Sequence, residues 1–339
     1  MQRCLDLALK AEGLTYPNPI VGAVIVHEGR IIGEGYHIRA GGPHAEVIAI
    51  ESVKESRLLR SSKLYVSLEP CSHFGRTPPC ADLIIARKIP EVVIGTTDTS
   101  EKVGGRGIKK LRDAGCIVTV GVEEEKCRWI NKRFFTFNEK KRPYIILKWA
   151  CSADGFLDVV RHPESPRMVN WITGNPERIL VHRWRASEQA ILAGAGTIRA
   201  DNPMLNIREW KGNNPLRLIL NGSGSLPVNP AISNTPGTNI IFTFFPEKVI
   251  AGTAVRLNEE QPSAEQVAGY LYDRGIQSLF VEGGARVLDH FISTGYWDEA
   301  RIFRGSQLFG NGVRAPLIGG KLVSHTRFSH STLDILVRE

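Results

Sequence analysis

Residues 41–50 read GGPHAEVIAI, and residues 67–83 read SLEPCSHFGRTPPCADL. The first stretch places a histidine at the start of an apolar segment, which Pro43 marks as the beginning of a helix. The second places one cysteine after a strand-like run and another after two prolines, where a further helix begins. Zinc prefers nitrogen and sulfur ligands, and a catalytic zinc site combines three of them with water. The two stretches therefore predict a zinc site formed by His44, Cys71 and Cys80.

Glu46 follows the histidine by two residues, so the two side chains would face nearly opposite ways in the middle of a helix. At a helix start the geometry is looser, and Glu46 can reach a water molecule held by the metal. Zinc lowers the pKa of such a water, and zinc deaminases use a glutamate that is not a ligand to move protons. Their signature joins H-x-E to P-C-x-x-C, whereas here the second cysteine comes nine positions later. We predict that Glu46 is the catalytic acid and base.

Two other interpretations of these residues stay open at this point. Each residue taken alone is more often a packing residue than a ligand, although the joint set favours a metal. His73 is a competing ligand, and a fourth protein ligand would indicate a structural zinc site. Because three ligands suffice for catalysis, we expect His73 to contact substrate instead.

The bulk composition is that of an ordinary globular protein with room for two domains. The chain has 339 residues, of which 42% are hydrophobic and 23% charged. No apolar run reaches the roughly 18 residues of a membrane span, and no secretory signal is evident, so we expect a cytoplasmic protein. Six cysteines are too few for a disulfide framework in a chain of this length. Lys and Arg outnumber Asp and Glu by 23 to 17 in residues 1–142 and by 20 to 18 in residues 143–339.

Residues 1–142 show the element order α-β-β-α-β-α-β-α-β, which predicts a mixed sheet with helices on its faces. Two strands are expected on either side of a turn at Glu28-Gly29, since β-branched residues cluster on both sides of it. The segment 123–142 begins as a helix and ends as a charged, polar stretch. We place the domain boundary near Arg142-Pro143.

Residues 143–339 show a second alternating series, which predicts another α/β domain. A strand over 144–150 precedes a helix over 175–189, with Asn175 as its cap and Pro176 at its first position. Further strands are expected at 190–194, 216–221, 239–244 and 278–284, and a helix at 263–275. The turns GAGT and VEGGAR follow strands and offer main-chain amides to phosphate. Neither fits G-x-G-x-x-G, so ordinary strand-to-helix turns explain them equally well.

Longer motifs resemble a known family along nearly the whole chain. HAE with EPCSHFGRTPPC, preceded by YPNPIVGAVIV and GYHIRAGGP, resembles the deaminase half of the bifunctional riboflavin-biosynthesis deaminase/reductases. The long spacing between the two cysteines is the spacing of that family. LKWACSADG, NWITG, RASEQAILAGAGTIRADNPMLNIR and LFVEGGARV resemble its reductase half, in the same order. The resemblance implies a cytidine-deaminase-like three-layer domain over 1–142 and a dihydrofolate-reductase-like α/β domain over 143–339.

The resemblance also implies roles for individual residues of the reductase half, with NADPH as cofactor. The cofactor is expected at Cys151, Trp171, Thr197, Asp201, Ser223 and Gly284. The substrate is expected at Val169, Arg185, Leu205, Arg208 and Glu282. The two arginines suit a phosphate monoester, and valine 169 departs from the serine that the family commonly has. Lys148 could support charge at the reacting sugar as a catalytic residue, although a lysine snorkelling from a strand edge is nearly as good an interpretation.

The implied function is a two-step reaction of riboflavin biosynthesis. One zinc ion serves hydrolytic deamination of 2,5-diamino-6-ribosylamino-4(3H)-pyrimidinone 5′-phosphate, and NADPH then reduces the ribosyl group to ribityl. Asn18, His37 and His73 are candidate contacts to the base, and Arg76 to the phosphate. We expect phosphorylated pyrimidines as substrates, no nucleic-acid or membrane partner, and a homo-oligomer, dimer or tetramer. The alternative is an RNA deaminase with an appended RNA-binding domain, but the second half shows no RNA-module motif.

Overall fold

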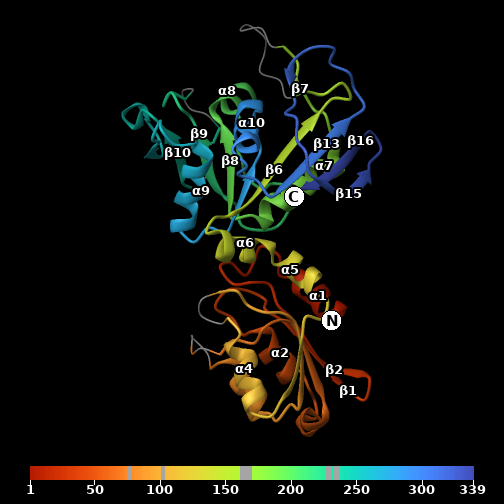
Figure 1. The fold of residues 1–339 in the computed structure, drawn as a ribbon. Coiled ribbons are helices and arrows are strands. Elements are labelled where there is room, and N and C mark those ends of the chain that lie inside the picture. Colours follow the sequence, from red (N-terminus) through yellow and green to blue (C-terminus); the bar gives the residue numbers. More distant parts are fainter. Residues whose placement is uncertain (73, 75–77, 101–103, 161–169, 227–230, 233–236) are drawn as a thin grey trace. The chain divides into compact units, whose positions relative to one another are not determined.

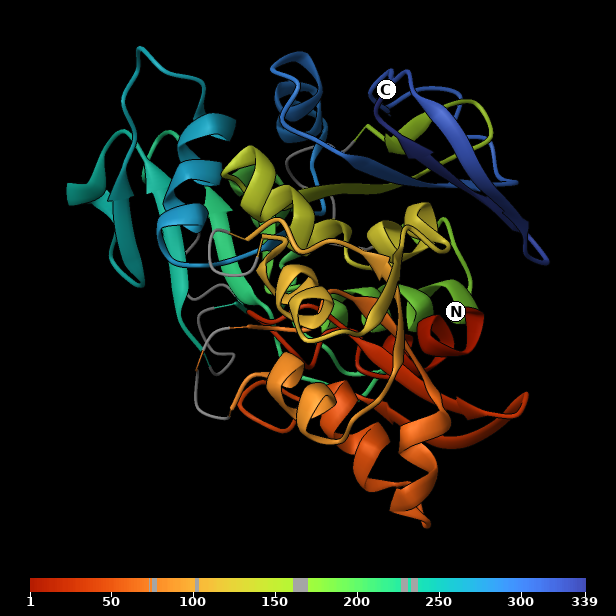
Figure 2. The same cartoon turned by 60° about the horizontal axis from the view of Figure 1, so that its bottom comes forward.

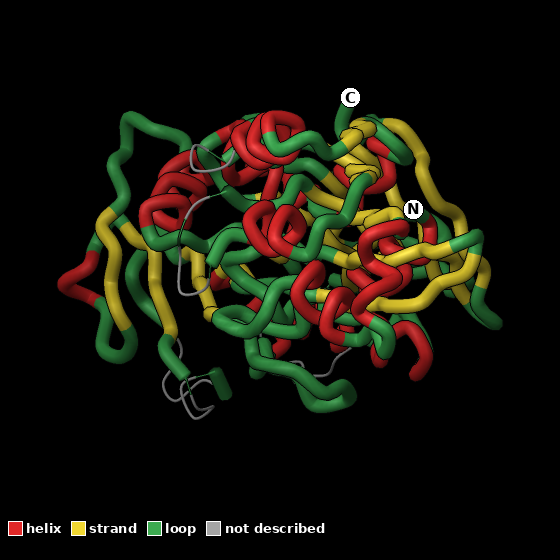
Figure 3. The backbone as a smooth tube through the Cα atoms, turned by 90° about the horizontal axis from the view of Figure 1, so that it is seen from below, coloured by secondary structure: helices red, strands yellow, loops and turns green. Residues whose placement is uncertain are grey.

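The chain folds into two compact units, Met1–Lys141 and Arg142–Glu339. The computed structural model describes residues 1–72, 74, 78–100, 104–160, 170–226, 231–232 and 237–339. Each unit has its own sheet and its own helices (Figure 1), and Figure 3 shows the described helices and strands in separate colours. Each unit also has its own apolar core. In the described residues, no helix combines the length and the apolar character that crossing a membrane requires.

The first unit is built on a mixed sheet with the strand order β2-β1-β3-β4-β5. β1 pairs antiparallel with β2 and β3, whereas β3, β4 and β5 are parallel. The predicted turn joins β1 to β2, and Glu28 and Gly29 both have positive φ there. The antiparallel and parallel pairings together confirm the predicted mixed sheet. The strands are β1 Gly22–His27, β2 Arg30–Tyr36, β3 Lys63–Leu68, β4 Glu91–Thr96 and β5 Ile117–Val120.

Helices cover both faces of this sheet, which gives three layers. The helices are α1 Gln2–Leu9, α2 Ala45–Glu51, α3 Cys80–Ala86, α4 Arg106–Asp113, α5 Glu124–Ile130 and α6 Lys132–Lys140, with a 3-10 helix at Ser56–Ser61. Apolar residues of α2, α3 and α4 share one core with β1, β3 and β4. α1 packs against the other side of β1 and β3, and α5 lies against β4.

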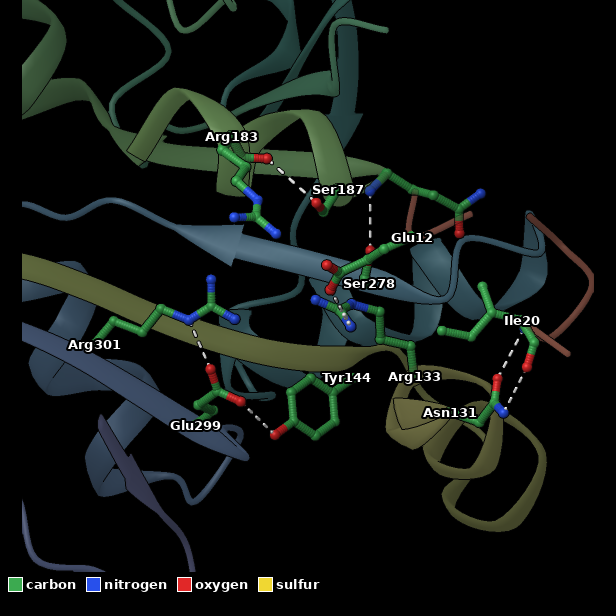
Figure 4. Close-up of polar contacts among 11 residues, drawn as sticks. Glu12, Ile20, Asn131, Arg133, Tyr144, Arg183, Ser187, Ser278, Glu299 and Arg301 are labelled. Carbon is green, nitrogen blue, oxygen red and sulfur yellow. Dashed lines mark hydrogen bonds and ion pairs between the residues drawn. The ribbon is translucent and has the colours of Figure 1, made fainter. Parts of the chain in front are cut away.

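The end of the segment 123–142 differs from the prediction, because it forms a second helix and not a polar stretch. Phe134 and Phe135 of α6 are buried against Leu68, and this burial holds a helix whose other face is charged. Asn131 lies between α5 and α6, where its side chain exchanges two hydrogen bonds of 2.9 Å with the main chain of Ile20 (Figure 4).

The second unit is built on a larger sheet with the strand order β11-β10-β9-β8-β12-β6-β13-β16-β15. The strands from β11 to β13 run parallel, and β16 and β15 continue the sheet antiparallel (Figure 2). They span β6 Tyr144–Cys151, β8 Ala190–Gly194, β9 Leu216–Leu220, β10 Asn239–Thr243, β11 Thr253–Arg256, β12 Ser278–Val281, β13 Glu299–Gly305, β15 Lys321–Arg327 and β16 Ser331–Val337. β7 Phe156–Asp158 and β14 Val313–Arg314 form a separate pair.

Four α-helices flank this sheet in the described residues. They are α7 Asn175–Ser187, α8 Ala195–Asp201, α9 Ser263–Asp273 and α10 Ala285–Ser293, and a short 3-10 helix spans Pro246–Lys248. α9 and α10 share one core with the sheet, and α7 and α8 share the core on its other face. The predicted cap of α7 is wrong: Gly174 is the cap and Asn175 is already helical, without a capping side-chain hydrogen bond.

A buried polar cluster sits within the second unit at the start of β6 and β13. Arg301 Nε donates to Glu299 Oε1 over 2.6 Å, and the Tyr144 hydroxyl donates to Glu299 Oε2 over 2.9 Å (Figure 4). The guanidinium of Arg301 also lies over the Trp184 ring, 4.5 Å from its centroid. One oxygen of the buried carboxylate therefore accepts from a charged donor and the other from a neutral donor, as burial of a charge requires.

Candidate active sites

The three predicted metal ligands meet in the first unit, although they come from separate elements. His44 caps α2 with extended backbone angles, Cys71 follows β3, and Cys80 is the first residue of α3. His44 Nδ1 lies 3.3 Å from Cys80 Sγ and 3.5 Å from Cys71 Sγ. All three ligand atoms lie within 4.8 Å of one another. One nitrogen and two sulfurs at this spacing fit zinc, which binds such atoms at about 2.0–2.3 Å.

Close packing between α2 and β2 positions the histidine. A Cβ atom on Gly35 of β2 would lie only 2.5 Å from the Ala45 carbonyl oxygen and the Ala49 nitrogen. A Cβ atom on Gly33 would lie 2.5 Å from the Ala49 oxygen. Two glycines on one face of the strand therefore let the helix backbone lie directly on the sheet, which brings its first residue to the cysteines.

The carboxylate of Glu69 holds the strand end that leads into Cys71. Its Oε1 accepts the N–H groups of Gly107 and Ile108 over 2.9 and 3.2 Å. Its Oε2 accepts those of Gly105 and Asp98 over 3.0 and 3.2 Å. Asp98 and the start of α4 are thereby fixed to the segment that carries the first cysteine. The motif EPCSHFGRTPPC contains this residue but does not indicate its role, because its partners are main-chain amides far along the chain.

Glu46 is buried beside the ligands, with 3% of its surface exposed. Burial raises the pKa of this carboxyl group to about 7, against the opposing effect of the nearby His44 ring. A carboxyl group with a pKa near neutrality can both accept and deliver protons at physiological pH. The geometry therefore suits the predicted role of a proton carrier next to the metal ligands.

The two thiols differ in their tendency to ionise. Cys71 Sγ accepts the main-chain N–H of Cys80 over 3.3 Å. The hydrogen bond from the Cys80 thiol, with those from His44 and this N–H, lowers the pKa of Cys71 to about 4 in spite of burial. The same thiol contact and burial raise the pKa of Cys80. The amide at the start of α3 thus stabilises the Cys71 thiolate.

The predicted base contacts of the deaminase half are only partly within the described residues. His37 is buried, its Nδ1 lies 2.9 Å from the Pro43 carbonyl oxygen, and its Nε2 lies 3.1 Å from Asn18 Nδ2. The ring also packs edge-on against His44, with centroids 5.4 Å apart. Both ring nitrogens of His37 therefore face protein partners. The predicted residues His73 and Arg76 lie outside the described residues.

The second unit contains a cavity of about 880 Å³ at the carboxyl ends of its central parallel strands. α8 and α10 begin there, after β8 and β12 respectively, so their first main-chain amides lie at its edge. Parallel α/β sheets bind ligands at this edge, and the volume is that of a cofactor site. Six predicted residues line it: Lys148, Thr197, Asp201, Ser223, Glu282 and Gly284. The sequence did not indicate the lining residues Arg199, Asn221, Arg286 and His290.

Arg185 and Glu282 form a nearly buried ion pair next to this cavity. Arg185 Nε and Nη2 donate to the two oxygens of Glu282 over 2.6 and 2.7 Å, and Nη1 donates to the Asn206 carbonyl over 2.9 Å. Burial alone would raise the pKa of Glu282, but Arg185, with Lys148, lowers it to about 2. Burial lowers the pKa of Lys148, and Glu282 opposes that change. The charges of Lys148, Arg185 and Glu282 therefore influence one another's pKa values.

The remaining predicted residues of the reductase half, as far as the structure describes them, do not line the cavity. Cys151 is in the core, and Trp171 is exposed with the guanidinium of Arg178 over its ring at 4.7 Å. Leu205 is buried and has a φ of 48°, which is unusual for a leucine. Arg208 is exposed and donates to the Asn206 side chain over 2.8 Å. Residue 169 lies outside the described residues, so the effect of its valine stays a prediction.

Two protein-family models match this chain in consecutive regions. The cytidine and deoxycytidylate deaminase zinc-binding region matches residues 1–96. The RibD C-terminal domain matches residues 143–334, which is more than half of the chain. The first match contains the cluster of His44, Cys71 and Cys80, so the chain carries a zinc-binding deaminase region.

Curated relatives and a solved structure match nearly the full length. The riboflavin biosynthesis protein RibD of Aquifex aeolicus is 39% identical, over 92% of this chain and 88% of that protein. RibD of Bacillus amyloliquefaciens is 35% identical, over 98% and 92%. A deaminase/reductase from Thermotoga maritima superposes with a TM-score of 0.87 and 37% identity, covering 100% of this chain and 97% of that one. These matches confirm the fold class predicted from the sequence. This chain belongs to the RibD family, the bifunctional deaminase/reductases of riboflavin biosynthesis.

Proposed function

We propose that the chain deaminates 2,5-diamino-6-ribosylamino-4(3H)-pyrimidinone 5′-phosphate and then reduces the ribosyl group of the product to ribityl. Residues 1–142 carry the first reaction and residues 143–339 the second. The observation that carries the proposal is the cluster of His44, Cys71 and Cys80 with the buried Glu46 beside it. The cavity of the second unit, with helix starts at its edge, supports the reductase assignment.

In the deamination, the residues of the first unit hold zinc and move protons. Zinc, when bound by His44, Cys71 and Cys80, polarises a water molecule and lowers its pKa. Glu46 takes a proton from that water and delivers protons to the ring nitrogen and to the departing ammonia. Its pKa of about 7 suits both halves of this transfer. Asn18 faces the base, with His37 behind it, and His73 and Arg76 contact base and phosphate.

In the reduction, NADPH supplies the hydride and this chain supplies binding and charge. Gly284 and Thr197 pack together at the starts of α10 and α8, where a Cβ on the glycine would lie 3.3 Å from Thr197 Oγ1. Such a tight junction brings main-chain amides to the phosphates of a dinucleotide. Lys148 supports the negative charge that develops at the sugar oxygen. The Arg185–Glu282 ion pair keeps the carboxylate charge of Glu282 in place near Lys148. Cys151, Trp171, Asp201, Ser223, Leu205, Arg208 and Val169 complete the proposed cofactor and substrate contacts.

The proposal also covers the partners, the assembly and the cellular location of the protein. Its partners are phosphorylated pyrimidines and no nucleic acid, it assembles as a homo-oligomer, and it works in the cytoplasm. The modest positive charge suits phosphorylated small molecules.

The test compares ammonia release and NADPH absorbance, with the zinc-loaded chain and the diaminopyrimidinone phosphate as sole substrate. Glu46→Gln should lower ammonia release by about 10² to 10⁴-fold, the usual contribution of a general acid and base. NADPH oxidation should fall with it, because no reducible product is formed. Glu51→Gln, on the exposed face of the same helix, is the matched control and should keep both signals.

The outcomes separate the two halves of the proposal. Supplying the deaminated product directly should restore NADPH oxidation in the Glu46→Gln variant. Ammonia release by the wild type with no NADPH oxidation would overturn the reductase assignment for this substrate. If neither product appears, the substrate is wrong, and deamination of RNA is the next activity to measure.

A further inference from the structure

Asn221 follows β9 at the edge of the cavity and has a buried side-chain donor without a partner. Only 1% of the residue is exposed, and it lines the cavity. Its Oδ1 accepts the Ser223 hydroxyl over 3.2 Å, but its Nδ2 has no hydrogen-bond partner among the described residues. A buried donor left unpaired costs about 1–3 kcal/mol, so such groups usually have a ligand or water as partner.

The backbone holds this residue firmly while its amide can turn. The Asn221 N–H donates to the Phe242 carbonyl of β10 over 2.9 Å, and its own carbonyl accepts the Gly224 N–H over 3.0 Å. The terminal torsion of an asparagine side chain is soft, so the amide can rotate to meet an acceptor in the cavity. The residue is therefore fixed in place and still able to donate to a ligand.

The surroundings of Asn221 carry hydroxyl donors and a positive charge. The turn 221–225 reads NGSGS and contains no acidic residue. Ser223 lines the cavity and lies 3.3 Å from the Ser225 hydroxyl. Arg199 of α8 also lines the cavity, and its Nη2 donates to the Ser225 carbonyl over 2.9 Å. Asp201, which lines the cavity too, is engaged within the protein.

We propose that Asn221 donates from Nδ2 to the 2′-phosphate of NADPH and so selects this cofactor over NADH. In Rossmann-type folds, a carboxylate binds the ribose 2′-hydroxyl of NADH, whereas an arginine lies near the 2′-phosphate of NADPH, and the same chemistry applies to a 2′-phosphate in another fold. Arg199 and the hydroxyl-rich turn match the second arrangement. The inference rests on the proposed reductase function and adds to it a residue that determines cofactor specificity.

Equilibrium binding of NADPH and NADH to the zinc-loaded full chain tests the proposal. A hydrogen bond to a charged group contributes about 1.5–3 kcal/mol, so Asn221→Leu should weaken NADPH binding by about tenfold to a hundredfold. NADH binding should change by less than about threefold, since it has no 2′-phosphate. Asn221→Asp should weaken NADPH binding further through charge repulsion, whereas Asn258→Asp, an exposed residue outside the cavity lining, should leave it unchanged.

The thermal stability of the cofactor-free protein supplies a second readout. Because Asn221→Leu removes an unpaired buried donor, Tm should stay the same or rise. Equal losses for both cofactors, no loss for either, or a large fall in Tm would overturn the role and leave Asn221 as a packing residue. If the wild type binds neither cofactor, the reductase proposal itself fails. Competition by adenosine 2′,5′-bisphosphate against adenosine 5′-monophosphate should show the same selectivity as the intact cofactors.

Discussion

His182 shows how a buried, neutral histidine can hold a loop in place. It lies on α7 one turn before Arg185, has 4% of its surface exposed, and accepts the Arg208 N–H at Nδ1 over 3.2 Å. Burial, with the charges of Arg185 and Arg208, lowers its pKa to about 4, while Glu209 and Glu282 oppose the change. The ring is therefore neutral at pH 7 and acts as an acceptor that holds the loop of Arg208.

The depressed pKa of this histidine predicts a pH dependence of stability. Between pH 6.5 and 4 the unfolded chain binds a proton that the folded chain excludes, so stability is lost as the pH falls through this window. The contribution is up to about 1.4 kcal/mol per pH unit. His182→Asn keeps an acceptor but cannot titrate, so its free energy of unfolding should fall less over the same range. Denaturant unfolding at each pH measures this free energy. If it falls equally with pH in the wild type and the variant, the assignment to His182 is wrong.

At the scale of elements, direct contact between β2 and α2 sets the position of the metal ligand. The helix carries His44 at its cap and Glu46 in its first turn, and it lies on Gly33 and Gly35 without side chains between. A methyl group on either glycine has no room unless the helix moves. The zinc site therefore depends on a strand that contributes no ligand to it.

Gly35→Ala should accordingly weaken both the fold and the metal site. Overpacking typically destabilises by about 1–3 kcal/mol, and moving α2 should lower zinc affinity as well. Denaturant unfolding of the metal-free chain and zinc titration measure the two effects. Gly269→Ala is the control, because that glycine lies on the exposed face of α9 with nothing within 4 Å. It should raise stability by up to about 1 kcal/mol and leave zinc binding unchanged. Unchanged zinc affinity in Gly35→Ala would show that the ligands tolerate movement of the helix.

At the scale of the whole molecule, the two chemistries are confined to different units. The clustered zinc ligands belong to Met1–Lys141, and all residues that line the cavity belong to Arg142–Glu339. Each unit has its own apolar core, so a change in one core does not require a change in the other.

Removal of zinc by a chelator should therefore abolish only one of the two reactions. Ammonia release from the diaminopyrimidinone phosphate should stop, whereas NADPH oxidation with the deaminated product should continue at its former rate. Added zinc should restore the first activity. Loss of both activities at the same chelator concentration would show that the reductase half depends on the metal.

Local sequence determined much of the fold and the chemistry of the zinc site. β-Branched residues on both sides of the Glu28-Gly29 turn predicted β1 and β2, and prolines marked the starts of α2 and α3. These signals suffice because turn geometry and helix starts depend on neighbouring residues. The ligand set was equally evident, because zinc chemistry restricts its ligands to few residue types.

Other features were decided only when distant segments came together. β15 is exposed and carries Lys321, His325 and Arg327, so nothing in its sequence marks it as a strand until β16 pairs with it. α6 depends on burial of two phenylalanines against a strand end. The Arg185–Glu282 pair joins residues 97 positions apart, so the local sequence does not reveal the contact. The burial of the Asn221 amide, whose Nδ2 has no partner among the described residues, likewise appears only in the folded chain. A motif indicates which residue types the chemistry needs. Burial and strand pairing depend instead on contacts between distant segments, and only the free energy of the whole fold decides which of these contacts form.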